Sequence, residues 1–215
     1  MPRFLRRTRK PPVRYYVYLS RTKVEMLFPQ ISKSFSHELE VELTARTGLL
    51  DATVRRTPDE PVAQLAAQAA AVEAYLVERD EVGSISEPAR YIRGDAPLRY
   101  GIVTEYAADL AVFAGSAGAV KLGLIGSPES LVGSVASKKA NHSTYYYTLE
   151  FLNGLASDRF EARERPPYCN SYAEAIDIAL AALPPPDYRL EFLAKVLHSQ
   201  ADTLLATPIY VALTE

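Results

Sequence analysis

Hydrophobic positions in the first part of the chain follow the periods of short strands and of one small helix. Tyr15–Leu19 is an aromatic run that favours a strand. Ser20 is a good N-cap directly after it, and the following residues predict a short helix that stops at Pro29. Apolar residues and glutamates then alternate over His37–Leu43, which predicts a half-buried strand with a solvated acidic face.

Three further segments have apolar residues three or four positions apart, which is the spacing of an amphipathic helix. The capping box Thr57–Glu60 opens the first segment, which runs to about Asp80. Ser171 opens the second segment, and the prolines from Pro184 onward end it. Asp187 opens the third segment. Its expected inward positions are Leu190, Leu193, Val196 and Leu197.

The remaining segments predict strands. Residues 89–125 have the pattern of an antiparallel meander in which Gly115–Gly118 forms a hairpin turn. Ile209–Leu213 predicts a closing strand with its odd-numbered side chains on one buried face, and residues 145–155 fit a strand or a helix equally well. These elements predict an α+β fold, a largely antiparallel sheet of about six to eight strands with about four helices packed on it. The strand order is left open.

Basic residues are concentrated at the N-terminus. The first 14 residues have six basic and no acidic side chains, whereas the remaining 201 residues have 18 basic and 26 acidic side chains, a net charge of −8. Residues 1–14 are therefore predicted to be a flexible arm, because so few apolar residues cannot bury enough surface to fold. We expect any contact with nucleic acid or with a protein partner on this arm. Its basic residues are Arg3, Arg6, Arg7, Arg9, Lys10 and Arg14.

The amino-acid composition indicates a globular protein of one domain. A hydrophobic content of 48% and a charged content of 23% are typical of a globular protein, and residues 15–215 are predicted to form one domain. The single cysteine, Cys169, has no partner for an internal disulfide, which favours a reducing compartment. No stretch approaches the ~18 apolar residues of a membrane span, and no apolar signal segment follows the N-terminal charges. We therefore expect a cytoplasmic protein.

The strongest local signal for ligand binding is the strand end at Gly126 and Ser127. Free backbone N–H groups after such a strand can bind phosphate or carboxylate, although an ordinary capped turn explains the same residues. A second basic cluster can bind an anion or form surface ion pairs, and it consists of three arginines among tyrosines, Arg90, Arg93 and Arg99. If these residues converge with a lysine of the next hairpin, the ligand-binding residues are Arg93, Arg99, Lys121, Gly126 and Ser127.

Motifs that indicate catalysis or metal binding are incomplete. Ser20 and Lys23 fit the S-x-x-K pattern, but the other elements of penicillin-binding enzymes are missing and a helix cap explains Ser20. His37 and Glu38 lack the second histidine of a zinc protease motif. We therefore predict no metal ligand and no cofactor, and the catalytic residues stay unknown.

Five segments carry a resemblance to a known set of sequences: Tyr16–Gln30, Glu87–Gly101, Phe113–Gly133, Arg189–Lys195 and Ala206–Val211. They resemble an uncharacterised family of bacterial proteins that is common in actinomycetes. The resemblance extends over nearly the whole chain from about Tyr15 onward. It implies one domain, because these segments occur together, and it implies no activity.

Together, these observations favour a module that binds a small anionic, nucleotide-like ligand in a sensing or accessory role. Two other classes stay open, namely an enzyme acting on a phosphorylated small molecule and a protein-interaction module. An enzyme should bring titratable residues together in one pocket, whereas an interaction module should have an exposed apolar patch and no pocket. Ligand identity, catalysis and oligomeric state are not determined at this level.

Overall fold

The computed structural model describes residues 14–31, 61–103, 109–133, 172–200 and 202–214. Six predictions concern residues outside the described ranges. They are the arm up to residue 13, the strand from His37, the capping box at Thr57, the ambiguous segment 145–155, the surroundings of Cys169 and the helix start at Ser171.

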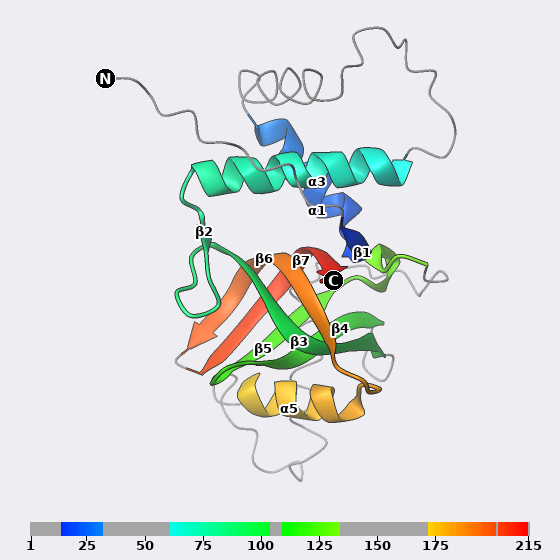
Figure 1. Cartoon of the computed structure of the whole chain (residues 1–215), viewed down its shortest axis with the longest axis vertical. Helices are drawn as coiled ribbons and strands as arrows, with labels where there is room; N and C mark the ends of the chain where they lie inside the picture. Colours follow the sequence, from blue (N-terminus) through cyan, green and yellow to red (C-terminus); the bar gives the residue numbers. More distant parts are fainter. Residues whose placement is uncertain (1–13, 32–60, 104–108, 134–171, 201, 215) are drawn as a thin grey trace, which may run out of the picture.

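The centre of the fold is a closed barrel of five strands (Figure 1). These strands are β3 (Tyr91–Val103), β4 (Leu110–Ala117), β5 (Val120–Gly126), β6 (Tyr188–Gln200) and β7 (Thr203–Leu213). They are hydrogen-bonded in the order β3-β4-β5-β7-β6, and β6 pairs with β3 to close the ring. The β5–β7 pair is parallel and the other four pairs are antiparallel. Outside the ring, β1 (Tyr15–Leu19) pairs with β7 and the short β2 (Val82–Gly83) pairs with β3.

The length of β3 explains how the sheet closes. The first part of this 13-residue strand pairs with β6 and the last part pairs with β4. Leu98 lies at the junction, opposite Tyr188 on one side and Gly115 on the other. One strand therefore belongs to both edges of the sheet, and no edge of the barrel is left unpaired.

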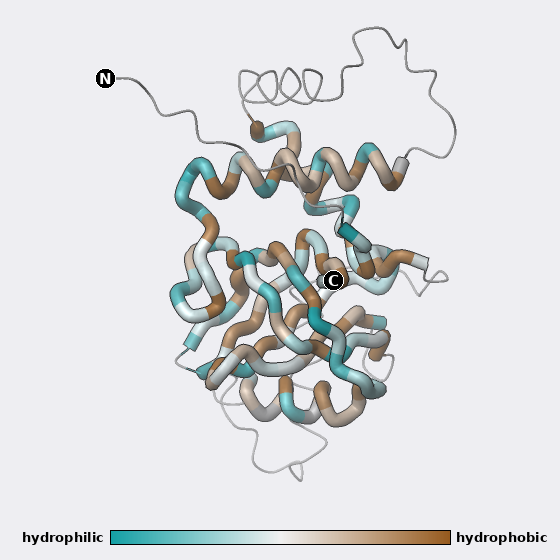
Figure 2. The backbone as a smooth tube through the Cα atoms, in the orientation of Figure 1, coloured by the Kyte–Doolittle hydropathy of each residue, from teal (hydrophilic) through white to brown (hydrophobic). Residues whose placement is uncertain are grey.

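Apolar side chains form three layers, one inside the barrel and two outside it. Figure 1 shows α5 (Tyr172–Ala182) on one side of the barrel and α1 (Arg21–Leu27) with α3 (Pro61–Glu78) on the other. The outward residues of β4 and β5 pack against α5, whereas those of β6, β7 and β1 pack against α1 and α3. Figure 2 shows the hydrophobic residues along the barrel strands. The largest fully buried side chains are Tyr18, Tyr210, Phe113, Phe192, Ile92, Leu98, Leu122, Leu124, Ile125 and Leu190.

The predicted α+β class, a largely antiparallel sheet with about four helices, is wrong. The described residues are mainly β, with a closed five-stranded barrel and three α-helices. The error has a physical origin, because barrel closure depends on pairing between β3 and β6, about a hundred residues apart. Local periodicity carries no information on such pairing.

The helix predicted from Asp187 is also wrong, since this segment is the strand β6. Its apolar residues have helical spacing only because both faces of β6 are buried. Leu190, Phe192 and Ala194 point into the barrel, while Leu193 packs outward against the α1–α3 layer. A strand buried on both faces loses the alternation by which strands are normally predicted.

The closing strand is confirmed, but its side chains do not share one face. Val211 packs inside the barrel, whereas Ile209 and Tyr210 pack outside it with α1 and α3. The register against β6 shifts at this point, where Leu193 is opposite Tyr210 and Ala194 is opposite Pro208. The extra residue reverses the direction of the side chains on either side of it.

Four local predictions are confirmed. β1 occupies the expected aromatic run, and Ser20 caps α1 by accepting a hydrogen bond from the Lys23 backbone N–H at 3.4 Å. The predicted hairpin is the β4–β5 pair, and its turn has Gly118 at a φ of 61°. The buried face of α3 contains the predicted stripe, Leu65, Ala69, Val72 and Leu76.

The order of the barrel strands is also that of the OB fold, which many oligonucleotide-binding and oligosaccharide-binding proteins share. Those proteins bind their ligands on the second and third strands, which correspond to β4 and β5. In this protein Ile176 and Ala179 of α5 cover that face and pack with Val112 and Ile125. This face is therefore occupied by α5 among the described residues, and the strand order by itself assigns no ligand.

Candidate functional site: a cation-lined groove

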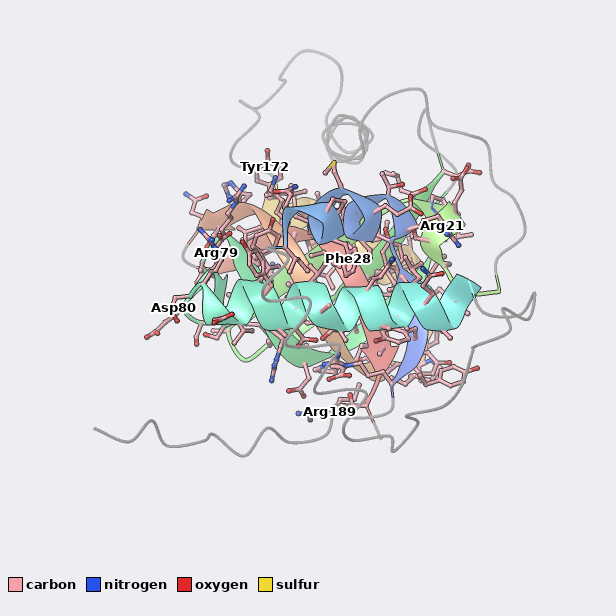
Figure 3. The ribbon with its side chains drawn as sticks, turned by 90° about the horizontal axis from the view of Figure 1, so that it is seen from above. Arg21, Phe28, Arg79, Asp80, Tyr172 and Arg189 are labelled. Carbon is pink, nitrogen blue, oxygen red and sulfur yellow. The ribbon has the colours of Figure 1, made fainter. Side chains whose placement is uncertain are left out.

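A groove of about 1140 Å³ lies between the α1–α3 layer and the barrel. Its walls come from α1, the adjoining 3-10 helix η1 (Phe28–Gln30), the end of α3 and a second 3-10 helix, η2 (Pro128–Ser130). Its floor comes from β3, β6 and β7. Figure 3 shows α1 alongside α3, with Arg21 and Arg79 at opposite ends of the two helices. Distant parts of the chain therefore meet at one concave surface, as is typical of ligand sites.

Cationic side chains outnumber anionic ones around this groove. Five cationic residues line it, against two carboxylates, those of Glu81 and Glu129. The whole chain, by contrast, has a net charge of −2. The five cationic residues are Arg21, Lys23, Arg79, Arg90 and Lys195. An excess of positive charge on a concave surface raises the local concentration of anions.

Lys23 lies in an environment that is unfavourable for a charge. Its side chain is half-buried, with Nζ 5.9 Å from the centre of the Tyr18 ring. Among the described residues no carboxylate forms an ion pair with it. Burial lowers the pKa of the Lys23 ammonium to about 8, because the charged form loses water without gaining an opposite charge. Perturbed groups of this kind are frequent at functional sites.

Replacing Lys23 by methionine should therefore stabilise the protein, by about 1 kcal/mol at neutral pH. The folded-state pKa is below the ordinary value of 10.5, so the wild type has the full cost of the buried charge below about pH 8. This cost disappears as the pH rises from about 8 towards 10.5, and the difference between the two proteins should shrink over that range. Urea unfolding at several pH values measures it. The exposed Lys195→Met is the matched control and should change stability by less than about 0.5 kcal/mol. A marked loss of stability in Lys23→Met would contradict the prediction.

Glu81 bridges two arginines at the end of the groove formed by α3. Its carboxylate lies 3.3 Å from Arg79 Nε and 3.3 Å from Arg90 Nη1. Arg79 Nη1 also donates a hydrogen bond to the Tyr75 hydroxyl at 3.2 Å. Two guanidinium groups share one carboxylate, and their side chains are 56% and 66% exposed. One positive charge therefore remains uncompensated at this end and accessible to a ligand.

Three residues in one cross-strand row contribute to the floor of the groove. Tyr91 is the register partner of Lys195, and Lys195 is the register partner of Thr207, so their side chains lie on the same face. Thr207 is buried, and its Oγ1 has no hydrogen-bond partner among the described residues. Lys195 is exposed and has no carboxylate partner there either. A buried hydroxyl without a partner marks a place where a polar ligand atom or a water molecule fits.

Serine side chains surround the other end of the groove. Ser127 and Ser130 line the groove near the buried hydroxyl of Tyr18, and burial raises the pKa of that hydroxyl. Gly126, in contrast, packs against Tyr18 and does not line the groove. A Cβ atom at Gly126 would lie 2.2 Å from the Tyr18 hydroxyl oxygen, so only glycine fits there. Ser127 is thus the one predicted ligand residue among the described groove residues.

The other three predicted ligand residues lie elsewhere and have carboxylate partners. Arg93 Nη1 is 3.2 Å from a carboxylate of α3, and Arg99 Nε is 2.7 Å from a carboxylate of the segment before β6. Lys121 pairs with a carboxylate of α5. Arg99 and Lys121 lie on the α5 side of the barrel, and Arg93 lies on the α3 side. The structure therefore does not bring the predicted residues together in one cavity.

A second polar cluster is buried beside α3. The Glu73 side chain, 9% exposed, accepts hydrogen bonds from Arg14 at 2.7 Å, from Tyr210 at 3.0 Å and from Arg93 at 3.2 Å. Arg14 also pairs with Glu191 at 2.6 Å and lies 4.6 Å above the centre of the Tyr210 ring. Burial opposes the charge of Arg14, but the hydrogen bond and charge of Glu73 outweigh it and raise the pKa of the guanidinium. Burial, followed by the charge of Glu73, also raises the pKa of the Tyr210 hydroxyl, which therefore remains a donor.

This cluster belongs to the scaffold of the domain. Its charges pair with one another, and they connect α3 to β3, β6 and β7. Arg14, which the charge pattern assigns to the flexible arm, has a side chain only 8% exposed and lies within the domain. The sequence does contain one signal for the cluster, namely a glutamate at the edge of the apolar stripe of α3.

Neither a metal-binding cluster nor a membrane-spanning helix occurs in the part of the chain that the structure describes. No group of three or more His, Cys, Asp and Glu side chains there is arranged to hold a metal ion. None of the described helices has both the length and the apolar character needed to cross a bilayer. His198 packs its ring against Tyr172 at 4.5 Å, within a half-buried contact.

The fold and the groove define a closed β-barrel protein with one cation-lined candidate site. The chain belongs to the family described as "Family of unknown function (DUF7019)", whose model matches residues 14–215. The match begins at Arg14, the first residue held by the Glu73 cluster. This is an uncharacterised single-domain family. No curated protein and no solved structure matches the chain.

Sequence reasoning missed four of the five groove cations as ligand residues, Arg79, Arg90, Lys195 and Arg21, and it set Lys23 aside with the incomplete S-x-x-K motif. That motif places Lys23 directly after a capped helix start, where its side chain turns toward the barrel. Arg90 belongs to the basic cluster among tyrosines that the sequence shows. No local signal marks the other three, because Arg21, Arg79 and Lys195 lie in different parts of the chain and only the tertiary structure makes them neighbours.

Proposed function

We propose that this protein binds an anionic small molecule of the nucleotide-like class in the groove between α1 and the barrel. The observation that supports this proposal is the set of five cations around one cavity, against two carboxylates. Lys23 and Lys195 have no acidic partner among the described residues, so a bound anion would supply the missing charge. A concave site favours ligand binding over the role of a protein-interaction module, which would need an exposed apolar patch.

The polar and aromatic lining supports a ligand with hydroxyl groups and a planar ring. Ser20, Thr22, Ser127 and Ser130 offer hydroxyl groups. The half-buried Tyr75 offers an aromatic ring beside Arg79, whose guanidinium carbon lies 5.5 Å from the ring centre. Hydroxyl groups pair with phosphate or ribose oxygens, and aromatic faces stack on bases. Phosphorylated nucleosides combine these features.

A thermal-shift screen with nucleotides, sugar phosphates and polyphosphate tests the proposal. A ligand at a hundred times its Kd should stabilise the wild type by about 2.7 kcal/mol. Lys23→Gln should weaken binding about tenfold. Lys121→Gln is the matched control, because Lys121 pairs with Asp177 outside the groove, and it should leave binding unchanged. Affinity should fall as the pH rises above about 8, where Lys23 loses its proton. Absence of any stabilising anion, or equal losses in both variants, would contradict the proposal.

An enzyme acting on a phosphorylated small molecule is the second candidate. It is supported by the pKa of about 8 for Lys23, which lies close enough to neutrality for proton transfer. The test is turnover of the ligand found in the screen, measured with the wild type and with Lys23→Gln. Binding of the ligand without turnover would contradict the enzyme hypothesis and would be consistent with a binding module in an accessory role.

We also propose a cytoplasmic location in a bacterium, on the basis of the lone Cys169 and of the sequence resemblance. The basic residues Arg3, Arg6, Arg7, Arg9 and Lys10 remain the proposed contact for a protein or a nucleic acid. Arg14 is removed from that set, because its charge is paired with Glu73 and Glu191.

A further inference from the structure

We propose that the ligand of the groove carries two anionic groups, one at each end, joined by an apolar or planar linker. This inference rests on the proposed function and specifies the chemical class of its ligand. The cations of the groove do not form one cluster. They lie at two ends that are separated by a mostly apolar floor.

The first end is formed by α1 and η2. Lys23 points into it without a carboxylate partner among the described residues, and Ser20, Ser127 and Ser130 lie around it. Arg21, at the start of α1, adds a second positive charge and pairs at the surface with Glu25, 3.4 Å away. Glu129 of η2 also lines the groove, so the two groove cations exceed the one groove carboxylate at this end by one charge. Positive charge and several hydroxyl groups are the usual partners of a phosphate.

The second end is formed by the end of α3 and the start of β3. Arg79 and Arg90 share the single carboxylate of Glu81, and Lys195 adds a further charge from the neighbouring strand. The three cations therefore exceed the one anion by two charges at this end. In Figure 3, Arg79 lies at the opposite end of the α1–α3 pair from Arg21.

The register of the sheet gives the distance between the ends. From β3 the floor passes through β6 and β7 to β1, since Tyr91 pairs with Lys195, Lys195 with Thr207, and Leu19 with Tyr210. Ser20 follows directly and donates its backbone N–H to the Ile209 carbonyl at 2.9 Å. Neighbouring strands lie about 4.8 Å apart, and Ile209 lies two residues from Thr207 along β7, an offset of about 7 Å. Two to three strand spacings combined with this offset separate the ends by roughly 12–16 Å. A single phosphate cannot contact both ends over this distance.

The floor between the ends fits a linker that is apolar apart from one polar atom. Val72, Leu76, Leu197 and Ile209 line this part of the groove. The exception is the buried Thr207 hydroxyl, which has no hydrogen-bond partner among the described residues. Charged groups therefore have favourable positions at the two ends, and an apolar or aromatic body has a favourable position between them.

A series of alkane bisphosphonates that lengthen by two carbons at a time measures this spacing directly. Isothermal titration calorimetry should show the highest affinity for the member whose phosphonates are roughly 12–16 Å apart. That member should bind at least about tenfold more tightly than the alkane monophosphonate of equal length. Lys23→Gln and Lys195→Gln should each reduce its affinity towards that of the monophosphonate, while Lys121→Gln should not.

The outcomes separate this inference from the proposed function. If the monophosphonate and the bisphosphonate bind equally well, or if affinity simply rises with chain length, the two-ended ligand is wrong and a one-anion site remains. If nucleotides and sugar phosphates bind but every bisphosphonate spacing binds equally, the same conclusion holds. If no anion of any kind binds, the proposed function itself fails.

Discussion

Deleting residues 207–215 should prevent the protein from folding. The deletion removes Ile209, Tyr210 and Val211, which are fully buried. It also removes every β7 residue that pairs with β1. Loss of large buried side chains costs about 3–5 kcal/mol each, and the total stability of a domain is only about 5–15 kcal/mol. Circular dichroism and thermal unfolding of the truncated chain measure the effect. A soluble, cooperatively folded product would show that β7 is peripheral.

The matched control removes residues from the other terminus. Deletion of residues 1–13 retains Arg14 and its ion pairs with Glu73 and Glu191, so it should change Tm by less than about 2 °C. Arg14→Ala in the same shortened chain should then lower Tm by several degrees, because Glu73 and Glu191 each lose the ion pair with Arg14. The contrast places the boundary of the folded domain between residues 13 and 14.

Replacing Glu73 by alanine is the point substitution with the largest expected effect. Arg14 would remain with a side chain 8% exposed and without its closest carboxylate, and the Tyr210 hydroxyl would lose its acceptor. Breaking a buried ion pair from one side costs about 3–5 kcal/mol. For a chain of this length that corresponds to a fall in Tm of about 10 °C. Chemical denaturation and differential scanning calorimetry measure it.

A double substitution tests whether the uncompensated charge is the cause. Glu73→Leu combined with Arg14→Met removes both charges and keeps the apolar volume, so it should recover most of the stability lost in Glu73→Ala. Glu25→Ala is the control, because the Arg21–Glu25 pair is exposed and should contribute less than about 0.5 kcal/mol. If the double variant is no more stable than Glu73→Ala, packing rather than charge explains the loss.

Local signals were sufficient for elements whose pattern is read from neighbouring residues. The Ser20 cap, the apolar stripe of α3 and the β4–β5 hairpin all have a local physical cause, respectively a capping side chain, helical spacing and a glycine turn. Wherever one face of an element is buried and the other is solvated, the period of the pattern identifies the element.

β6 shows where this reasoning fails. Both of its faces are buried, because one lies inside the barrel and the other lies under the α1–α3 layer. Leu190, Leu193 and Leu197 then have helical spacing by coincidence, and nothing within the segment distinguishes the two structures. Only the pairing with β3 and β7 selects the strand.

The candidate site shows the same division. Of the residues predicted to bind an anion, Ser127 lines the groove, whereas Arg93, Arg99 and Lys121 form ion pairs elsewhere. The local sequence around an arginine does not show whether its guanidinium group faces a carboxylate of the same protein or the solvent. That difference depends on residues far away along the chain, such as Glu73 beside Arg93, 20 positions earlier.

The sequence by itself determined the local elements that have one buried and one solvated face, the excess of basic charge at the N-terminus and the absence of any complete catalytic motif. These follow from propensities, capping and charge, which act over a few residues. The tertiary structure alone decided that the sheet closes into a barrel, that Arg14 belongs to the domain, and that Lys23 and Lys195 line one groove. Each of these depends on contacts between residues that are distant in the chain, and the free energy of such contacts exists only once the fold brings them together.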